Sequence, residues 1–274
     1  MTGRLAHRVV FVTGSGGISS AGVRLFAAEG ASVFVASLDA EGCETLANDV
    51  AHDGGQIDWV MADLRLEAAT TEAFARCRDR FGRVDGLFAV VGGSGRRFGD
   101  GPVHEVSLEA WEDTFALNGL PMFLATREAV RAMLAAGNGG SVVVVSSVVA
   151  DHPSPRFFGT HAYAAVKGAA GSFVRSVAAS YAPGGVRVNA VAAGVVATPM
   201  SRRAAADPAT VAYAREKQPL AGGFLPADAV AQAALFLLSD AARYVTGQVL
   251  TVDGGWSVTE VSRSLEANGP DQDV

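Results

Sequence analysis

Residues 9–19 read Val-Val-Phe-Val-Thr-Gly-Ser-Gly-Gly-Ile-Ser, and a helical pattern follows over 18–29. A short apolar strand that passes through a glycine-rich turn into a helix is typical of α/β folds. The backbone amides of such a turn point toward the helix N-terminus, where the helix dipole favours an anion. As a lone signal the turn is weak, since glycine-rich turns are common. It predicts a pyrophosphate site at Gly14, Ser15, Gly17 and Ile18.

Apolar runs and helical patterns alternate along the whole chain. The candidate strands are Val9–Thr13, Ser32–Ala36, Ile57–Met61, Leu87–Val91, Ser141–Ser146, Arg187–Ala192 and Gln248–Val252. The candidate helices cover 18–29, 41–51, 67–81, 107–135, 161–182 and 227–239. Because the strands are continuously apolar, helices should cover both faces of the sheet. The sequence therefore predicts an α/β fold with a doubly wound parallel β-sheet of about seven strands.

Composition limits the partners and the compartment. The chain has 22 basic and 28 acidic residues, a formal charge of −6 and no basic patch, so we expect no nucleic-acid partner. No apolar run approaches the roughly 20 residues that span a bilayer, and the first run is too short for a secretion signal. Cys43 and Cys77 form no CxxC pair, and the histidines lack ligand spacing. We expect a cytoplasmic protein with no membrane partner and no metal site.

The domain organisation is simple. We expect residues 1–256 to form one domain, since α/β folds of about 250 residues are commonly undivided. Residues 194–226 contain four prolines and make a connection longer than about 15 residues, which predicts a substrate lid. Residues 257–274 are polar toward their end and predict a flexible tail.

The end of the second strand bears on the cofactor. Dinucleotide-binding folds place an acidic residue here, on the ribose 2′-hydroxyl. Ser37 stands at this position, Leu38 follows, and no Arg or Lys adjoins them to receive a 2′-phosphate. Asp39 favours NAD over NADP, but it can equally be the N-cap of the helix over 41–51. The sequence leaves both cofactors open.

Tyr163 and Lys167 stand four residues apart in a helical pattern, so their side chains share a face. A phenol with a pKa near 10 is a poor acid or base at neutral pH, and a nearby ammonium lowers that pKa by stabilising the phenolate. Lys167 and Lys217 are the only lysines in the chain, which makes a chance pair at this spacing improbable. The pair predicts an acid–base site.

From about Leu5 to Trp256 the chain resembles a short-chain dehydrogenase/reductase of the single-domain kind. The resemblance rests on the glycine turn, Asp63-Leu64, Asn118, Ser146-Ser147, Tyr163 with Lys167, Asn189–Gly194 with Thr198-Pro-Met200, and residues 244–256. It implies a Rossmann-type fold and an NAD(P)-dependent oxidoreductase that interconverts a secondary alcohol and a ketone. The substrate would be small to medium-sized and largely apolar. The resemblance also implies a homotetramer or homodimer.

The resemblance assigns roles to individual residues. Tyr163 would transfer the proton, Lys167 would lower the pKa of Tyr163 and hold the ribose, and Ser147 would polarise the carbonyl. Asn118 would bind a water that links Lys167 to solvent. The cofactor would contact Gly14, Ser15, Gly17, Ile18, Ser37, Leu38, Asp63, Leu64, Gly92, Tyr163, Lys167, Val196 and Thr198. Taken singly, Ser147 can also be a strand-end cap, Asn118 a helix-kink hydrogen bonder and Asp63 a helix N-cap.

The chain departs from the family pattern in four places. The glycine turn is one residue short and ends in Ser19, Ala89-Val-Val-Gly92 replaces Asn-Asn-Ala-Gly, and Ala193-Gly194 replaces Pro-Gly. The segment 150–162 is a few residues longer than usual. Our hypothesis is that this segment and the lid shape an apolar substrate pocket to which His152, Arg156 or His161 adds polarity.

Two other classes of function stay open. The short glycine turn is compatible with a protein that binds a cofactor without redox turnover. Tyr163 is also compatible with a non-redox isomerase or dehydratase on the same fold.

Overall fold

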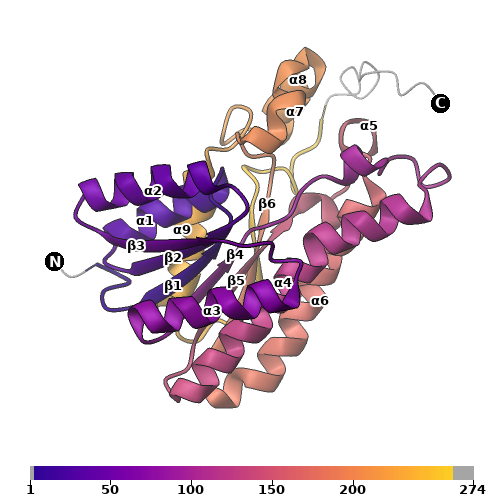
Figure 1. Ribbon diagram of the computed structural model, residues 1–274. Coiled ribbons are helices and arrows are strands. Elements are labelled where there is room, and N and C mark those ends of the chain that lie inside the picture. Colours follow the sequence, from indigo (N-terminus) through magenta and orange to yellow (C-terminus); the bar gives the residue numbers. More distant parts are fainter. Residues whose placement is uncertain (1–2, 262–274) are drawn as a thin grey trace.

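The computed structural model describes residues 3–261. Its seven strands form one parallel sheet in the order β3-β2-β1-β4-β5-β6-β7 (Figure 1). The strands are β1 (Val9–Thr13), β2 (Ser32–Ser37), β3 (Gln56–Met61), β4 (Gly86–Ala89), β5 (Gly140–Ser147), β6 (Val186–Ala193) and β7 (Val249–Val252). The strand order reverses between β1 and β4, which opens a crevice at the carboxyl ends of the strands. The predicted doubly wound sheet is confirmed.

Helices cover both faces of the sheet. They are α1 (Ile18–Ala28), α2 (Ala40–His52), α3 (Glu67–Phe81), α4 (Leu108–Ala136), α5 (Pro155–Phe158), α6 (His161–Tyr181), α7 (Arg202–Ala206), α8 (Pro208–Lys217) and α9 (Ala227–Leu238). In Figure 1, α1, α2 and α9 lie on one face and α3, α4 and α6 on the other. Among the described residues no helix is both long and apolar enough to cross a membrane.

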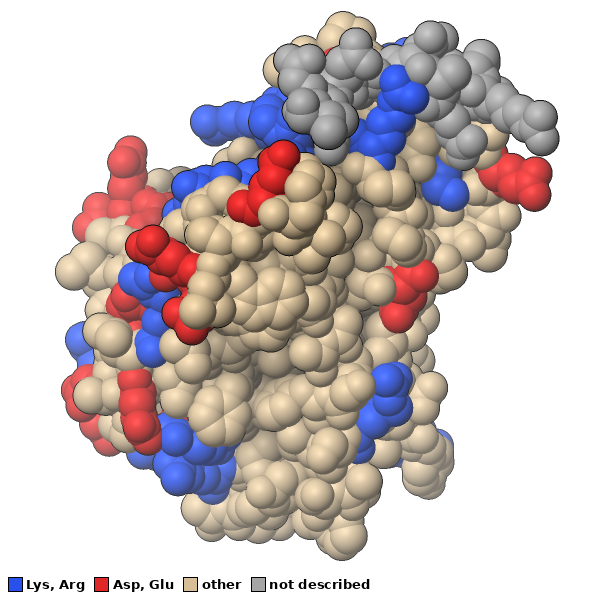
Figure 2. Space-filling view, turned by 90° about the vertical axis from the view of Figure 1, so that its right-hand side faces the viewer, with Lys and Arg blue, Asp and Glu red and all other residues tan. Residues whose placement is uncertain are grey.

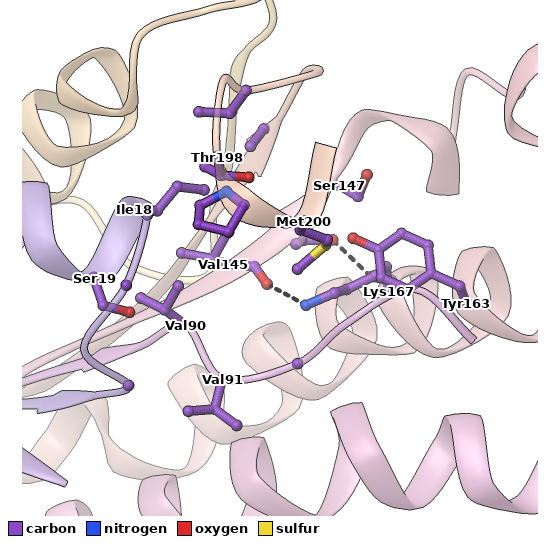
Figure 3. A pocket seen from close by; sticks show the side chains of 18 of the residues that line it. Ile18, Ser19, Val90, Val91, Val145, Ser147, Tyr163, Lys167, Thr198 and Met200 are labelled. Atoms are coloured by element: carbon purple, nitrogen blue, oxygen red, sulfur yellow. Dashed lines mark hydrogen bonds between the residues drawn. The ribbon is translucent and has the colours of Figure 1, made fainter. Parts of the chain in front are cut away.

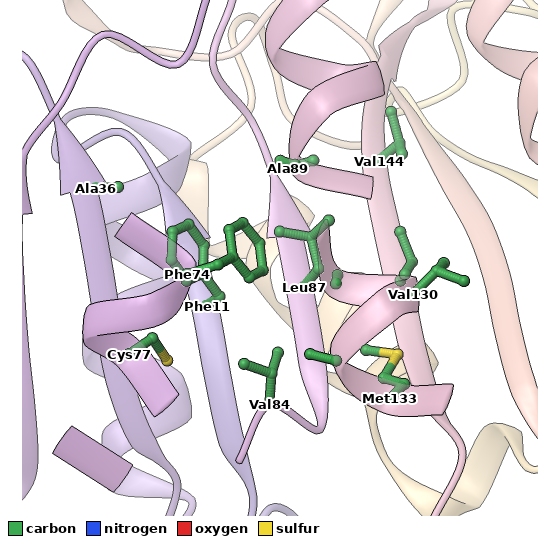
Figure 4. Close-up of a cluster of buried hydrophobic side chains, with 14 of the residues drawn as sticks. Phe11, Ala36, Phe74, Cys77, Val84, Leu87, Ala89, Val130, Met133 and Val144 are labelled. Atoms are coloured by element: carbon green, nitrogen blue, oxygen red, sulfur yellow. The ribbon is translucent and has the colours of Figure 1, made fainter. Parts of the chain in front are cut away.

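The core has two layers, one on each face of the sheet. On the face of α3 and α4, Phe11 stacks on Phe74 with ring centroids 3.9 Å apart, beside Leu87 (Figure 4). On the other face, Val12 packs in the cluster that contains Phe26. All five residues of β1 are buried, as a strand covered on both faces requires.

Two segments differ from the sequence prediction. The fourth strand ends at Ala89 instead of Val91, because the amides of Val90 and Val91 donate to Thr13 Oγ1 at 2.8 and 3.0 Å. The segment 194–226 contains α7 and α8, which the sequence did not indicate. Asp207 caps α8 by accepting from two amides of its first turn, and a proline fits that turn without loss of a hydrogen bond. Most of the predicted tail, residues 262–274, lies outside the described residues.

Candidate active site

The glycine turn joins β1 to α1 with its backbone exposed to a cavity. Gly14 and Gly17 have φ angles of 85° and 54°, which other residues rarely adopt. Gly17 caps α1 without a side-chain hydrogen bond; the Ser19 amide donates to the Gly16 carbonyl at 3.1 Å, and the N-terminus of α1 faces the cavity, where its dipole favours an anion. A Cβ on Gly17 would lie 2.9 Å from Thr198 Cγ2. Glycine is therefore needed where the turn meets the lid.

Two serines adapt the shortened turn to the strands. Ser19 is buried, and its hydroxyl donates to the Thr13 carbonyl at 2.9 Å. The Ser15 hydroxyl lies 3.1 Å from both the Ser37 hydroxyl and Asp39 Oδ2. The turn is thus fastened to the ends of both β1 and β2, although it lacks one residue and the last glycine of the family pattern.

An outer cavity of about 380 Å³ lies beside the turn at the ends of β2 and β3. Its lining includes the predicted cofactor residues Ser37, Leu38, Asp63 and Leu64, together with Asp39, Arg65 and Arg97. The interpretation of Asp63 as the N-cap of α3 is wrong, because Leu66 holds that position. Instead the Arg65 guanidinium binds the Asp63 carboxylate at 2.6 Å and holds its pKa below the ordinary value.

Asp39 does cap α2, as one interpretation of the sequence expected. Its Oδ1 accepts from the Gly42 amide at 3.0 Å, while Oδ2 faces Ser15. Its carboxylate nevertheless lies in the lining of the outer cavity.

A central cavity of about 330 Å³ extends from the glycine turn, with Gly14, Gly17, Ile18 and Gly92 in its wall, to the end of β5 (Figure 3). Ser147 ends β5, and Tyr163 and Lys167 lie on α6. Ser147 lies close enough to the Tyr163 side chain to lower the pKa of its phenol. Ser147 makes no side-chain cap to the turn that follows it, so the strand-end cap interpretation has no support. The structure brings these predicted residues together in one site.

Burial shifts both titratable groups of this pair. Burial raises the pKa of Tyr163, and Ser147 opposes that rise. Burial lowers the pKa of Lys167 from 10.5 to about 8. The Lys167 ammonium donates to the Val145 carbonyl at 2.9 Å and lies 5.7 Å from the centroid of the Tyr163 ring. Lys167 is still mostly protonated at neutral pH, so a positive charge lies beside the phenol.

Asn118 lies in α4 and holds the segment that follows β4. Its Oδ1 accepts from the Gly93 amide, and its Nδ2 donates to the carbonyls of Gly93 and Thr114 at 3.0 and 2.9 Å. A Cβ on Gly92 would lie 2.4 Å from Asn118 Oδ1 and 3.4 Å from Lys167 Nζ. Gly92 therefore allows Asn118 and Lys167 to approach the same point. The water-binding role of Asn118 stays a prediction.

Asp100 is a site residue that the sequence did not reveal. Its side chain is 3% exposed, and its two oxygens accept from the amides of Ala162 and Tyr163 at 3.0 and 2.9 Å. The local N-cap of α6, Thr160, makes no side-chain cap. Asp100 therefore caps α6 from a segment about 60 residues away and fixes the backbone of Tyr163. No local sequence signal could have paired them.

A third, smaller cavity lies under the lid, and we call it the lid cavity. It measures about 150 Å³. Its wall shares Ser147, Tyr163, Gly194, Val196, Thr198 and Met200 with the central cavity. The rest includes Phe158, Thr160, Arg96 and Arg203. The hydroxyls of Ser147 and Tyr163 thus lie where the two cavities meet.

The long segment 150–162 packs against the lid. The Phe157 ring stacks on Tyr213 of α8 at 4.2 Å, and the Trp256 indole donates to the His152 carbonyl at 3.1 Å. We expected His152, Arg156 or His161 to add polarity to the substrate pocket, but none of the three belongs to the lining of the lid cavity. The segment contributes Phe158 and Thr160, and the charge comes from Arg96 and Arg203.

The two ends of the lid meet at a closed neck. Val196 forms a bridge with Leu225. The fully buried Gln218 side chain accepts from the Val195 amide at 2.7 Å and donates to the carbonyls of Val195 and Gly223 at 3.1 and 2.6 Å. Val196 and Thr198 are held by this neck beside the glycine turn.

These cavities suit a dinucleotide. The outer and central cavities lie at the carboxyl edge of the sheet around the strand-order reversal, with the helix N-terminus in the central wall. A side chain at Gly17 or Gly92 would collide with its neighbours. Over residues 3–261, no group of three His, Cys, Asp or Glu side chains is arranged to hold a metal ion.

Comparison with known proteins identifies the family. The family described as enoyl-(acyl carrier protein) reductase matches residues 12–257. The chain is 35% identical over 253 residues to cis-4-hydroxycyclohexanecarboxylate dehydrogenase of Sinomonas cyclohexanicum, which covers 92% of this chain and 97% of that protein. The chain belongs to the short-chain dehydrogenase/reductase family.

The chain is also similar to other short-chain dehydrogenases/reductases. The 2,5-dichloro-2,5-cyclohexadiene-1,4-diol dehydrogenase of Sphingobium indicum is 35% identical over 257 residues, 92% of this chain and 98% of that protein. A solved short-chain dehydrogenase/reductase from Mycobacterium ulcerans superposes with a TM-score of 0.86 at 30% identity, covering 96% of each chain. The predicted class of enzyme is confirmed: the chain is an oxidoreductase of this family, of the kind that uses a nicotinamide dinucleotide on alcohols and ketones.

Proposed function

We propose that this enzyme interconverts a secondary alcohol and a ketone with Tyr163 as the acid–base group. The observation that carries the proposal is the position of the Ser147–Tyr163 pair in the wall shared by the central cavity and the lid cavity. A cofactor in one cavity and a substrate in the other would meet at these two hydroxyls. Residues 1–256 act in this proposal as one domain, with 194–226 as its lid.

The side chains divide the chemistry between them. In the direction of oxidation, the Tyr163 oxygen accepts the proton of the substrate hydroxyl, and the Ser147 hydroxyl hydrogen-bonds the oxygen that becomes the carbonyl. A bound nicotinamide ring supplies the acceptor for the hydrogen that leaves carbon with its electron pair. The Lys167 ammonium stabilises the phenolate form of Tyr163. Lys167 and Tyr163 also hold the ribose, and Gly92 leaves room for it.

The relatives indicate the kind of substrate. Both dehydrogenases named above act on a six-membered carbon ring with hydroxyl groups, according to their names. The lid cavity is lined largely by apolar groups, among them Val148, Phe158 and Met200. An apolar cavity of about 150 Å³ accommodates one six-membered ring. We therefore propose a secondary alcohol on a small carbocycle.

We propose NAD as the preferred cofactor. The Asp39 carboxylate lies in the outer cavity beside Ser37, where its charge opposes a 2′-phosphate. Arg65 is neutralised by Asp63, and Arg97 lies over the Phe98 ring. The ratio of kcat/KM for NAD to that for NADP should exceed one. A higher value with NADP would assign Arg97 to a 2′-phosphate instead.

One experiment tests the function. NADH and NADPH are titrated by fluorescence, and reduced cofactor is then followed by absorbance with a panel of cyclic alcohols and ketones, using Tyr163→Phe as the control. Turnover that is lost in the variant supports the proposal. Cofactor binding without turnover would favour a binding protein, and conversion of substrate without change in the cofactor would favour an isomerase or dehydratase.

The surface and the cysteines support two further proposals. Figure 2 shows that charged side chains are sparse across the middle of the face that carries α6 in Figure 1. Leu120 and Phe123 of α4 are 42% and 44% exposed. We propose a homotetramer or homodimer that covers such apolar surface, to be tested by light scattering. Cys43 and Cys77 are both free and buried, which supports a cytoplasmic location.

A further inference from the structure

Two arginines add positive charge to the wall of the lid cavity. Arg96 comes from the short 3₁₀ turn Gly95–Phe98 that follows β4, and Arg203 comes from α7 of the lid. Both belong to the wall that also contains Ser147 and Tyr163. The two arginines are more than 100 residues apart in the chain, and only the lid brings them to one cavity.

Carboxylates act on these two arginines from a distance, Asp100 on Arg96 and Asp207 on Arg203. Burial lowers the pKa of Arg96, the like charge of Arg203 lowers it further, and Asp100 acts in the opposite direction. The Arg96 guanidinium donates to the Phe157 carbonyl at 3.4 Å. Within residues 3–261, neither Arg96 nor Arg203 has a carboxylate within ion-pair distance.

The nearby carboxylates are already engaged. Asp100 accepts from the amides of Ala162 and Tyr163. The positive charge of Arg203 lowers the pKa of Asp207. The Asp207 carboxylate accepts hydrogen bonds from the amides of Ala209 and Thr210 at the start of α8. A guanidinium stays charged at all ordinary pH values, and Arg96 is half-buried while Arg203 is exposed beside it. Two positive charges in the wall of one cavity suit an anionic group on a ligand.

We propose that this anion belongs to the substrate: Arg96 and Arg203 bind a carboxylate on the molecule whose hydroxyl meets Ser147 and Tyr163. The inference rests on the proposed function and narrows its substrate class to cyclic hydroxy acids and keto acids. A guanidinium binds a carboxylate through two parallel hydrogen bonds, so it fixes orientation as well as charge. A lid cavity of about 150 Å³ holds one ring between the carboxylate and the reacting hydroxyl.

The geometry explains how the substrate is oriented. Ser147 and Tyr163 form one end of the lid cavity, next to the central cavity, and the arginines supply charge to the same cavity. A ring held by its carboxylate would present the carbinol carbon toward the central cavity. Because Arg203 is part of the lid, the bound carboxylate would also join the lid to the turn that carries Arg96.

Matched substrates and matched variants test this inference. The substrates are 4-hydroxycyclohexanecarboxylate, its methyl ester and cyclohexanol, and the variants are Arg96→Gln, Arg203→Gln and Arg96→Lys. Arg202→Gln is the control, because Arg202 is the neighbour of Arg203 and is exposed like it, but is absent from the lid cavity lining. We expect Arg96→Gln and Arg203→Gln each to lower kcat/KM for the acid by about 10- to 100-fold, mostly through KM. Values for cyclohexanol should stay near those of the wild type.

Arg96→Lys keeps the positive charge but loses the two parallel N–H donors of the guanidinium. Its kcat/KM for the acid should therefore lie between those of the wild type and Arg96→Gln. Equal kcat/KM for acid and ester in the wild type would overturn the inference. So would an equal loss for acid and cyclohexanol in Arg96→Gln, or weaker NADH binding with unchanged preference for the acid. The last result would assign the arginines to the cofactor.

A binding measurement separates this inference from the proposed function. Cyclohexanecarboxylate, which has no hydroxyl to oxidise, is titrated into the wild type and Arg96→Gln by calorimetry with NADH present. Binding that weakens at least about tenfold in the variant supports the carboxylate site even if no alcohol is turned over. Turnover of cyclohexanol with no measurable binding of cyclohexanecarboxylate would overturn the carboxylate site and leave the proposed function standing. Tighter binding of inorganic phosphate than of the carboxylate would overturn the choice of anion.

Discussion

The glycine turn and the Ser147–Tyr163–Lys167 group occupy two ends of one cavity, yet they are built by different means. The turn over 13–19 departs from the family pattern in length and in its last residue, and it offers backbone amides at the start of α1. The group at the other end keeps the family's residue types and offers hydroxyls and an ammonium. A binding site formed by backbone amides tolerates side-chain substitutions that keep the backbone conformation. A site formed by side-chain groups loses its function when those side chains are replaced.

The largest effect is expected at the side-chain end. Tyr163→Phe keeps the ring and removes the hydroxyl, so it should lower kcat by about 10² to 10⁴-fold. NADH measured by fluorescence should still bind, a few-fold more weakly, because the phenyl ring keeps its place on α6 while one of the two groups proposed to hold the ribose is lost. A variant that kept its kcat within tenfold of the wild type would exclude Tyr163 as the acid–base group.

Lys167→Met tests the cost of burying the ammonium. Lys167 has a pKa of about 8 when folded and 10.5 when unfolded, so its charge costs about 3 kcal/mol of stability at pH 7. Between pH 8 and 10.5 the unfolded chain binds more protons than the folded one, so the wild type gains stability as the pH rises. We expect the variant to lose activity, to match or exceed the wild type in urea unfolding at pH 7, and to lose that relative advantage by pH 9.5. A stability difference that does not change with pH would contradict the buried charge.

Asp100→Asn tests how the N-terminus of α6 is held. The amide group replaces one of two acceptors, which leaves a buried N–H of α6 without a partner and should cost about 1 to 3 kcal/mol of stability. The displaced Tyr163 backbone should lower kcat as well. Ser107→Ala is a matched control, because Ser107 caps α4 through the Ala110 amide outside these cavities. That control should lose about 1 kcal/mol with kcat intact. Equal kcat in both variants would remove the positioning role of Asp100.

The smallest effects are expected at the backbone end. Gly17→Ala strains a residue with φ of 54° and pushes a methyl group against Thr198, so NADH should bind about tenfold more weakly. Ser19→Gly removes a hydrogen bond to Thr13 and restores the family's glycine, and NADH affinity should stay near that of the wild type. A larger loss with Ser19→Gly than with Gly17→Ala would show that side chains control this end too.

Local patterns in the sequence predicted most of the fold. The strands and six long helices depend on runs of apolar residues, which are visible in any short window. The fourth strand was predicted two residues too long. The amides of Val90 and Val91 donate to the hydroxyl of Thr13, on β1, and so do not continue the strand. The helices α7 and α8 were missed, because the four prolines in 194–226 suggested a loop, although α8 begins at Pro208 and α7 follows a 3₁₀ turn that begins at Pro199.

The site was predictable only where the family's residues occur in the expected order. Ser147, Tyr163 and Lys167 meet as the resemblance implied. Asp100 and Arg96 carry no local signal, since their hydrogen-bond partners lie about 60 residues away in the chain, and Arg203 joins the same cavity wall from α7. Their roles arise from tertiary packing, which no single window of sequence contains.

The closed neck of the lid has a consequence for how the enzyme can diversify. Because Gln218 and the Val196–Leu225 bridge join the two ends of the segment, the loop between them is already closed. Changing the length of a closed surface loop costs little chain entropy. Segments of other lengths or charges can therefore be exchanged at 198–217 while the sheet and the Tyr163 helix stay as they are. In such an architecture, substrate choice and redox chemistry can evolve as separate traits.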